Sequence, residues 1–177
     1  MQTPSNPNIK DLLAASRQGN EEAFYGFYQI LHQPLFRFLL SRSKTREDAQ
    51  DILQELFIDL WRASGRFNYH SDAQFYGFVY RIARRKLSRH YQEKPAAQWQ
   101  DGNIRDSYEF IPEDFGQIRK VLNLLDEKYR LVIELRYWSQ LTLKEIAAVL
   151  EITENNVKIR HYRALKKMEE LLKKHDK

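Results

Sequence analysis

The stretch LTLKEIAAVLEITENNVKIRHYRALKKM, residues 141–168, is the most informative part of the chain. Thr142 and Glu145 have the S/T-x-x-E spacing of a capping box, and the apolar residues after them predict a short amphipathic helix. Beyond Glu151, Thr153 can cap a second helix that opens with polar and basic residues. Helix-turn-helix proteins present side chains to the DNA major groove in this way. An ordinary helical hairpin with a solvated face has the same pattern, so the rest of the chain has to decide.

Composition excludes several classes of protein. The chain has 177 residues, enough for one domain or two small ones, and 42% of them are hydrophobic. It contains no cysteine, which excludes disulfides, thiolate metal sites and thiol nucleophiles. No apolar run approaches the roughly 20 residues of a membrane span, and the start MQTPSNPNIK lacks a signal-peptide pattern. We therefore expect a cytoplasmic protein without membrane insertion.

The net charge of +5 is unevenly distributed. Residues 1–91 contain 13 Lys/Arg and 9 Asp/Glu, residues 92–118 contain 2 and 6, and residues 119–177 contain 14 and 9. Two basic blocks separated by an acidic strip suggest two nucleic-acid-facing modules on an acidic tether. Net charges this small can also simply confer solubility.

The chain is predicted to be almost entirely helical, because glycine is scarce and apolar residues do not alternate with period two. The expected helices run from Ile9 to Gly19, from Asn20 with a kink or break at Pro34, from Thr45 to about Ala63, and from Ser71 or Asp72 to about Tyr91.

Helical periodicity stops at Gln92 and resumes near Asp114, where four further helices are expected. The segment between has two prolines, a glycine and no helical stripe, as linkers do. We therefore predict an all-α protein of two small helical domains joined by a flexible linker, with the helix-turn-helix in the C-terminal one. The predicted ranges are 1–92, 93–113 and 114–177.

The predicted third helix carries an acidic stripe. Asp48, Asp51, Glu55 and Asp59 are spaced 3, 4 and 4 residues apart, which places them on one side of the helix. Carboxylates at this spacing repel each other unless a basic group binds them. A solvated face is the default interpretation, and a di-metal site would need Glu-x-x-His pairs that do not occur here. The apolar residues beside the stripe fit a protein-docking face best.

The predicted fourth helix (FYGFVYRIARRKLSRHY) combines a dense basic cluster with aromatic residues, and more aromatics lie in the loop before it. Cations that hold phosphates beside rings on which bases stack are typical of single-strand binding. The alternative is that most of these rings belong to the core, which we expect for Phe78. No pattern supports catalysis, because the five histidines are scattered and no nucleotide-binding or nucleophile motif occurs. We expect neither a metal nor a cofactor.

In this order, the segments resemble bacterial RNA polymerase sigma factors of the extracytoplasmic-function (ECF) subgroup. The resemblance spans about residues 24–172. Residues 48–61 resemble the helix that binds core polymerase, residues 78–91 the helix that melts the promoter and reads the −10 element, and residues 124–168 the domain that reads the −35 element. The resemblance implies an initiation factor that is not an enzyme.

The resemblance also implies partners and binding residues. The first set would dock on the clamp of the largest polymerase subunit: Asp48, Asp51, Ile52, Glu55, Leu56 and Asp59. The second would hold the opened −10 strand: Tyr69, Tyr76, Tyr80, Arg81, Arg84, Arg85, Lys86 and Arg89. The acidic linker would run toward the RNA exit channel, and an anti-sigma factor would mask both domains.

Helical phase predicts the −35 contacts. Val157, His161, Ala164 and Met168 repeat at alternating spacings of 4 and 3, so they face inward. Asn pairs with adenine and Arg with guanine, so Asn155, Asn156 and Arg160 are the candidates for base contacts. The candidates for the remaining DNA contacts, mostly to phosphates, are Thr153, Lys158, Arg163 and Lys166.

Four positions depart from the family pattern: Glu151 replaces the usual turn glycine, Arg85 and Arg89 replace Asn and Asp, and Asp126 replaces a proline. They concern promoter sequence and melting more than the class. Two alternatives stay open, a stand-alone LuxR-like helix-turn-helix regulator and a helical adaptor for acidic proteins. A LuxR-like protein usually has an α/β N-terminal domain, which the helical pattern contradicts.

Overall fold

The computed structural model describes residues 8–93 and 115–175, and all regular elements in these ranges are helical, which confirms the predicted fold class. The predicted linker, apart from residue 93, lies outside the described residues. The elements are α1 (Ile9–Arg17), α2 (Glu21–Arg42), α3 (Arg46–Ser64), α4 (Asp72–Glu93), α5 (Phe115–Asn123), α6 (Glu127–Ile133), the π-helical η3 (Glu134–Trp138), α7 (Leu143–Leu150) and α8 (Glu154–His175).

Helices α2 and α3 begin at the capping residues that the sequence predicts. The side chain of Asn20 accepts a hydrogen bond from the backbone N–H of Glu22 at 2.8 Å. Thr45 accepts one from the backbone N–H of Asp48 at 3.0 Å. Each cap satisfies an N–H group that the first helical turn leaves without a partner. Gly19, which follows the C-terminal end of α1, has φ +78°, a backbone conformation that glycine adopts without steric penalty.

A kink or a break was expected at Pro34, and the break does not occur, because α2 is one helix from Glu21 to Arg42. Proline removes one helical hydrogen bond and costs about 3 kcal/mol in a helix interior. Buried side chains on both sides of it, among them Leu31, Leu35 and Phe38, anchor α2 to the core. Tertiary packing therefore offsets the unfavourable local propensity.

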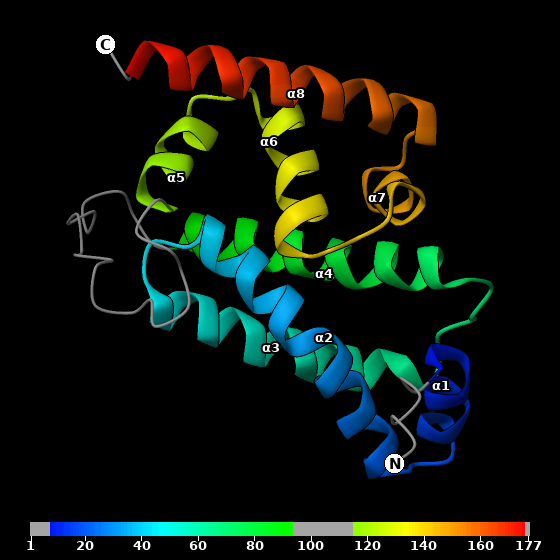
Figure 1. Cartoon of the computed structure of the whole chain (residues 1–177). Coiled ribbons are helices and arrows are strands. Elements are labelled where there is room, and N and C mark those ends of the chain that lie inside the picture. Colours follow the sequence, from blue (N-terminus) through cyan, green and yellow to red (C-terminus); the bar gives the residue numbers. More distant parts are fainter. Residues whose placement is uncertain (1–7, 94–114, 176–177) are drawn as a thin grey trace, which may run out of the picture.

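Helix α4 lies at the centre of the molecule (Figure 1). It packs on α2 and α3 on one side and on α7 on the other, and its contact with α7 is the largest between any two elements of the described part. Helix α8 packs on α6 and α7 and lies on the far side of them from α3. The N-terminal and C-terminal helices therefore form one assembly with α4 between them.

The apolar core is shared across this assembly. One continuous cluster of buried side chains includes Phe27 of α2, Leu56 of α3 and Tyr80 of α4, and it continues to Leu135 of η3 and Val149 of α7. A smaller cluster lies beneath α8 and contains Leu122, Leu125, Tyr129, Ile133 and Ala164. The sequence pattern predicted two helical modules but not that they would share a core.

A cluster of charges around the buried Glu134, here called the Arg42 cluster, also joins the two modules. Arg42 at the end of α2 donates to Glu134 at 2.6 Å and to Glu127 at 2.8 Å. Arg130 donates to Glu134 at 2.8 Å and to the carbonyl oxygen of Ser41 at 3.0 Å. Glu134 is completely buried. Burial alone would lower the pKa of Arg42, but the charge of Glu134 and the contacts with Glu127 outweigh it and raise the pKa.

Candidate nucleic-acid interface

The segment from α7 to α8 is a helix-turn-helix. Thr142 and Glu145 form the predicted capping box, in which the Thr142 N–H donates to the Glu145 carboxylate at 2.6 Å. Glu151 ends α7 with φ 56° and ψ 41°, in the left-handed region. Thr153 then accepts from the backbone N–H of Asn156 at 3.2 Å, so it caps α8 as predicted.

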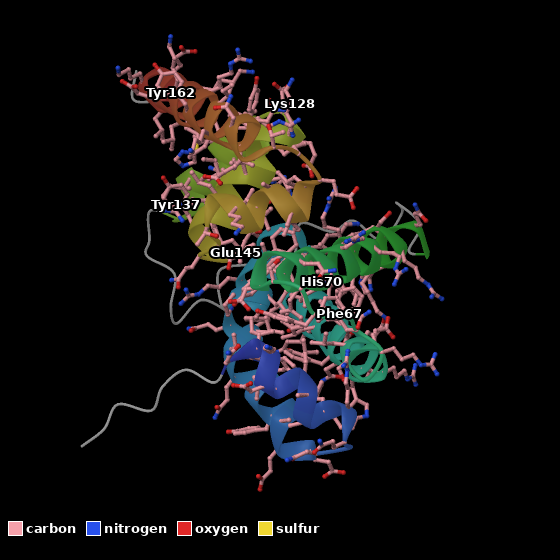
Figure 2. The ribbon with its side chains drawn as sticks, turned by 90° about the vertical axis from the view of Figure 1, so that its right-hand side faces the viewer. Phe67, His70, Lys128, Tyr137, Glu145 and Tyr162 are labelled. Carbon is pink, nitrogen blue, oxygen red and sulfur yellow. The ribbon has the colours of Figure 1, made fainter. Side chains whose placement is uncertain are left out.

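Helix α8 buries one face and exposes the other. Val157 and Ala164 are fully buried against the rest of the module, as the apolar repeat predicts. Arg160 is half-buried, and the other residues predicted to contact −35 DNA are exposed: Thr153, Asn155, Asn156, Lys158, Arg163 and Lys166. Helical phase also places Tyr162 outward, although it was not among the predicted DNA contacts. Its side chain is 69% exposed and projects from the end of the molecule away from Phe67 and His70 (Figure 2). An exposed ring of this size beside amide and guanidinium groups adds an apolar contact to the polar face.

Replacing Glu151 with glycine is expected to stabilise the protein. A non-glycine residue in the left-handed region destabilises the folded protein by about 1–2 kcal/mol, and glycine removes this strain. Glycine also makes the unfolded chain more flexible, which cancels part of the gain. We expect a gain of about 1 kcal/mol, or about 2–4 °C in Tm. Thermal unfolding followed by circular dichroism measures it.

Two further glycine variants test the cause. Gln140→Gly should act in the same direction, because Gln140 has φ 57°. Glu154→Gly should instead lower Tm, because Glu154 lies in the first turn of α8, where glycine only loses helix propensity. A lower Tm for Glu151→Gly would contradict the strain argument.

His161 of α8 faces Tyr137 of η3. The Tyr137 hydroxyl and His161 Nε2 are 3.1 Å apart, and the two rings are stacked with centroids 5.8 Å apart. Burial and then the charge of Arg136 lower the pKa of His161, and burial lowers the pKa of His32. Both histidines therefore bind a proton less readily in the folded protein than in the unfolded chain.

We expect the protein to lose stability as the pH falls through about 6.5, the ordinary histidine pKa, and toward the lowered folded-state values. In this window the unfolded state binds more protons, so acid favours unfolding. Urea unfolding midpoints measured between about pH 7.5 and pH 5.5 should show the decline. His161→Gln should flatten the profile, whereas the exposed His70→Gln serves as control. A profile unchanged by His161→Gln would contradict the assignment.

The basic side of α4 is partly engaged within the molecule. Arg84 and Arg85 are exposed, as is Arg89. Lys86 instead donates to Glu55 at 3.0 Å and lies 2.9 Å from Asp59 of α3. Burial alone would lower the pKa of Lys86, but these hydrogen bonds raise it. Part of the acidic stripe on α3 therefore has a basic partner in the same chain. Because Lys86 is engaged in these ion pairs, it is less available to contact DNA than the exposed arginines.

The aromatic residues predicted to contact −10 DNA are less accessible than the sequence suggested. Tyr80 is fully buried, with its ring packed edge-on against Phe38 at 5.3 Å, so it cannot reach DNA in this arrangement and that prediction is corrected. Tyr76 is half-buried, and burial followed by the charge of Glu145 raises its pKa to about 12. The alternation of aromatic and basic residues along α4 does not specify which rings pack against other helices of the molecule.

The loop between α3 and α4 has a defined shape. Arg17 of α1 donates to the carbonyl oxygen of Phe67 at 2.6 Å, and Tyr69 donates to Asp72 at 2.9 Å. The Phe67 ring packs against Phe75 and Phe78, with centroids 5.7 and 4.9 Å apart. Phe67 and His70 lie beside the N-terminal part of α4 (Figure 2). Tyr69 is half-buried and His70 is exposed, so this loop presents rings at the start of the basic helix.

Three predicted docking residues of α3 do not reach the surface, which corrects the prediction. Ile52 and Leu56 are 1% and 0% exposed because they form the inner face of the helix. Asp48 is 8% exposed and lies 2.9 Å from His90 Nε2. Asp51 and Glu55 are exposed, and Asp59 is half-buried.

The outer face of α3 contains two exposed apolar residues that were not among the predicted docking residues. Ile58 is 50% exposed and Trp61 is 38% exposed. The signal was present, because Ile58 follows Leu56 by two residues and so falls on the opposite side of the helix. Two adjoining open hollows share Phe57 and Ile58, and the larger, about 600 Å³, is also lined by Tyr28, His32, Phe36, Arg46, Gln50, Leu53 and Gln54.

Comparison with known proteins accounts for these features together. The family model of sigma-70 region 2 matches residues 27–95, and that of sigma-70 region 4 matches residues 115–168. The chain is also 30% identical over 135 residues to the RNA polymerase sigma-E factor of Streptomyces avermitilis, a match that covers 73% of each chain. The chain belongs to the sigma-70 family of RNA polymerase sigma factors.

The similarity extends to the ECF subgroup and to solved structures. This chain is 26% identical to the ECF RNA polymerase sigma factor SigX of Bacillus subtilis, in a match that covers 88% of this chain and 84% of the relative. The fold is similar to CnrH in its complex with the cytosolic domain of CnrY, with TM-score 0.73, 25% identity and coverage of 93% and 97%. It is also similar to the sigma factor RpoE bound to the anti-sigma factor NepR from Bartonella quintana, with TM-score 0.61, 25% identity and coverage of 83% and 96%.

The family settles the alternatives left by the sequence. The protein is an ECF sigma factor of transcription initiation, and its family is not one of enzymes. A LuxR-like regulator is not favoured, since region 2 matches the N-terminal helices. Within residues 8–93 and 115–175, none of the helices has the length and apolar character of a membrane span. In the same ranges, no His, Asp and Glu side chains gather into a metal-binding group.

Proposed function

We propose that this sigma factor binds core RNA polymerase through the outer face of α3 and holds promoter DNA with α4 and α8. The observation that carries the proposal is that α3 and α8 expose opposite chemistry on distant surfaces, acidic and apolar on α3, basic and amide-bearing on α8. One surface suits a protein clamp and the other suits DNA. The protein acts in the cytoplasm, where polymerase and promoters lie, and performs no catalysis itself.

The polymerase surface proposed for α3 contains Asp51, Glu55 and Asp59 together with the exposed Ile58. An apolar patch rimmed by charges is typical of protein docking sites. The carboxylates would steer and orient a basic partner, and Ile58 with the adjoining hollows would contribute most of the affinity. The largest polymerase subunit is the proposed partner, through its clamp.

The promoter contacts are divided between two helices. Arg84, Arg85 and Arg89 of α4, with Tyr69 of the preceding loop, are proposed to hold the opened −10 strand by phosphate contacts and stacking. On α8, Asn155, Asn156 and Arg160 are proposed to read base edges of the −35 element. The proposed phosphate contacts there are Lys158, Arg163 and Lys166.

An anti-sigma factor is proposed as a further partner. The similar sigma factor RpoE has been solved with the anti-sigma factor NepR, which supports this proposal. Such a partner would compete with polymerase or promoter DNA for one of the surfaces described above.

Reconstitution with bacterial core polymerase tests the proposed function. Promoters are first selected from a random duplex pool with the reconstituted holoenzyme, and run-off transcripts are then measured. The purified protein should convert core into an enzyme that initiates at discrete sites, and core alone should not. Failure to co-purify with core at low salt, or transcripts independent of the added protein, would reject the proposal.

A further inference from the structure

Two apolar side chains lie together on the polar face of α8. Ile159 is 41% exposed and Tyr162 is 69% exposed, and neither belongs to the two apolar clusters of the described residues. Single exposed apolar residues are common on protein surfaces and need no explanation. These two are three positions apart, however, so they are neighbours on one face of the helix. Packing within the fold therefore does not account for an adjoining apolar pair at this place.

The predicted DNA contacts surround this pair. Asn155 precedes Ile159 by four positions and Arg163 follows it by four, so all three side chains adjoin on the helix surface. The buried Val157 lies two positions before Ile159, which puts the two side chains on nearly opposite sides of α8. Ile159 therefore points outward more directly than Arg160, which is half-buried on the flank of the helix.

A side chain without hydrogen-bonding groups limits what it can face in the major groove. Against the nitrogen or oxygen edge of a base, isoleucine would displace water without replacing its hydrogen bonds. The C5 methyl group of thymine is the apolar feature that a base pair presents in this groove. An A·T pair also presents the adenine edge that asparagine binds, so Asn155 and Ile159 can read the same pair or adjacent pairs.

We propose that Ile159 and Tyr162 recognise the C5 methyl groups of pyrimidines in the −35 element. Thymine carries this methyl group in ordinary DNA, and 5-methylcytosine carries it where cytosine is methylated. The proposal rests on the proposed function, in which α8 reads the −35 element. It adds an apolar readout to the hydrogen bonds of the asparagine and arginine side chains, and it assigns promoter specificity to two residues outside that set.

Uracil substitution tests the proposal, because uracil pairs with adenine as thymine does and lacks only the C5 methyl group. A promoter is first selected with the holoenzyme. Each thymine of its −35 element, on either strand, is then replaced by uracil in turn, and holoenzyme binding is measured by competition with the unmodified duplex. Burial of one methyl group corresponds to about a three- to fivefold change in affinity. We expect a loss of this size at one or two thymines.

Variants of α8 assign each methyl group to a side chain. Ile159→Ala and Tyr162→Ala should each abolish the uracil effect at one position, because the apolar contact is gone. Tyr162→Phe keeps the ring and removes the hydroxyl, so it should keep the uracil effect of the parent protein. Leu165→Ala is the matched control, since Leu165 is 40% exposed on another side of the same helix, and it should reproduce the parent's pattern. Circular dichroism verifies that all four variants fold.

Methylation of cytosine provides the converse test. At a position that the uracil scan identifies, the thymine is replaced by cytosine, with guanine opposite, and the cytosine is used with and without its C5 methyl group. The methylated duplex should bind about three- to fivefold more tightly, and the corresponding alanine variant should remove the difference. Equal affinities would show that thymine is recognised through another atom, and would overturn the proposal.

The outcomes separate this proposal from the proposed function. The absence of any uracil effect on a holoenzyme that initiates normally would overturn methyl recognition and leave the proposed function unaffected. The same holds if both alanine variants retain the parent's uracil effect, or if the selected −35 element contains no thymine. If no selected duplex supports initiation, the proposed function fails, and methyl recognition fails with it.

Discussion

Asp51→Arg combined with Glu55→Arg is expected to abolish binding to core polymerase while the helical fold stays intact. Both side chains are exposed on the outer face of α3 and neither contributes to the core. The charge reversal places two cations next to Ile58, where they face the proposed basic surface of the partner. Like charges across an interface cost several kcal/mol. We expect affinity to fall at least about 100-fold, as when a binding hot spot is removed. Titration of labelled sigma factor with core, followed by anisotropy, measures it.

The intramolecular contact of Glu55 requires separate controls. Glu55→Arg also breaks the ion pair with Lys86 and repels it, so Lys86→Ala shows what that loss alone does. Glu47→Arg reverses a charge at an exposed position in the first turn of the same helix and should bind core normally. Normal core binding by the double variant would remove α3 from the proposed interface.

Arg42→Ala is expected to separate the two modules. The substitution leaves Glu134 fully buried with only Arg130 beside it, and breaking a buried ion pair in this way costs about 3–5 kcal/mol. Separation of η3 from α2 exposes Glu134 to water and avoids most of that cost. The arrangement in which the two modules pack together therefore becomes the less stable one, although each module keeps its own helices.

Urea unfolding distinguishes this outcome from simple destabilisation. The parent protein should unfold in one cooperative transition, because one apolar core runs through both modules. Arg42→Ala should unfold in two transitions, the first at a lower urea concentration. Arg37→Ala, on the same helix but outside the Arg42 cluster, is the matched control. A single transition with the parent's midpoint would show that the cluster does not hold the modules together.

The locally encoded parts of the fold were predictable from the sequence. Asn20, Thr45, Thr142 and Thr153 each cap the helix that follows, because a cap depends on residues two or three positions away. The inward positions Val157 and Ala164 follow from helical period alone. Pro34 shows the limit of this reasoning, since packing on both sides of it overrides its local preference.

The candidate sites were predicted less completely. Helical phase placed the polar face of α8 correctly. The family resemblance, however, assigned Ile52, Leu56 and Tyr80 to binding surfaces, and all three are buried. Each belongs to a motif that resembles a binding helix. A motif does not distinguish the side chains that pack the helix against the core from those that contact the partner. Ile58 was not predicted because the docking face was identified from the spacing of its acidic residues, and Ile58 is an apolar residue on that same face.

The sequence by itself determined the all-helical fold, the helix boundaries, the helix-turn-helix and the sigma-factor class, because these depend on neighbouring residues and on the order of segments. Only the tertiary structure decided that α7 covers α4, that Glu151 pairs with Arg81, and that Arg42 meets Glu134, 92 residues away in sequence. Such contacts depend on how packed surfaces fit together, and nothing in local spacing specifies which helix faces meet. Glu151 illustrates both levels, since its departure from the turn glycine is visible in the sequence and its partner is visible only in the fold.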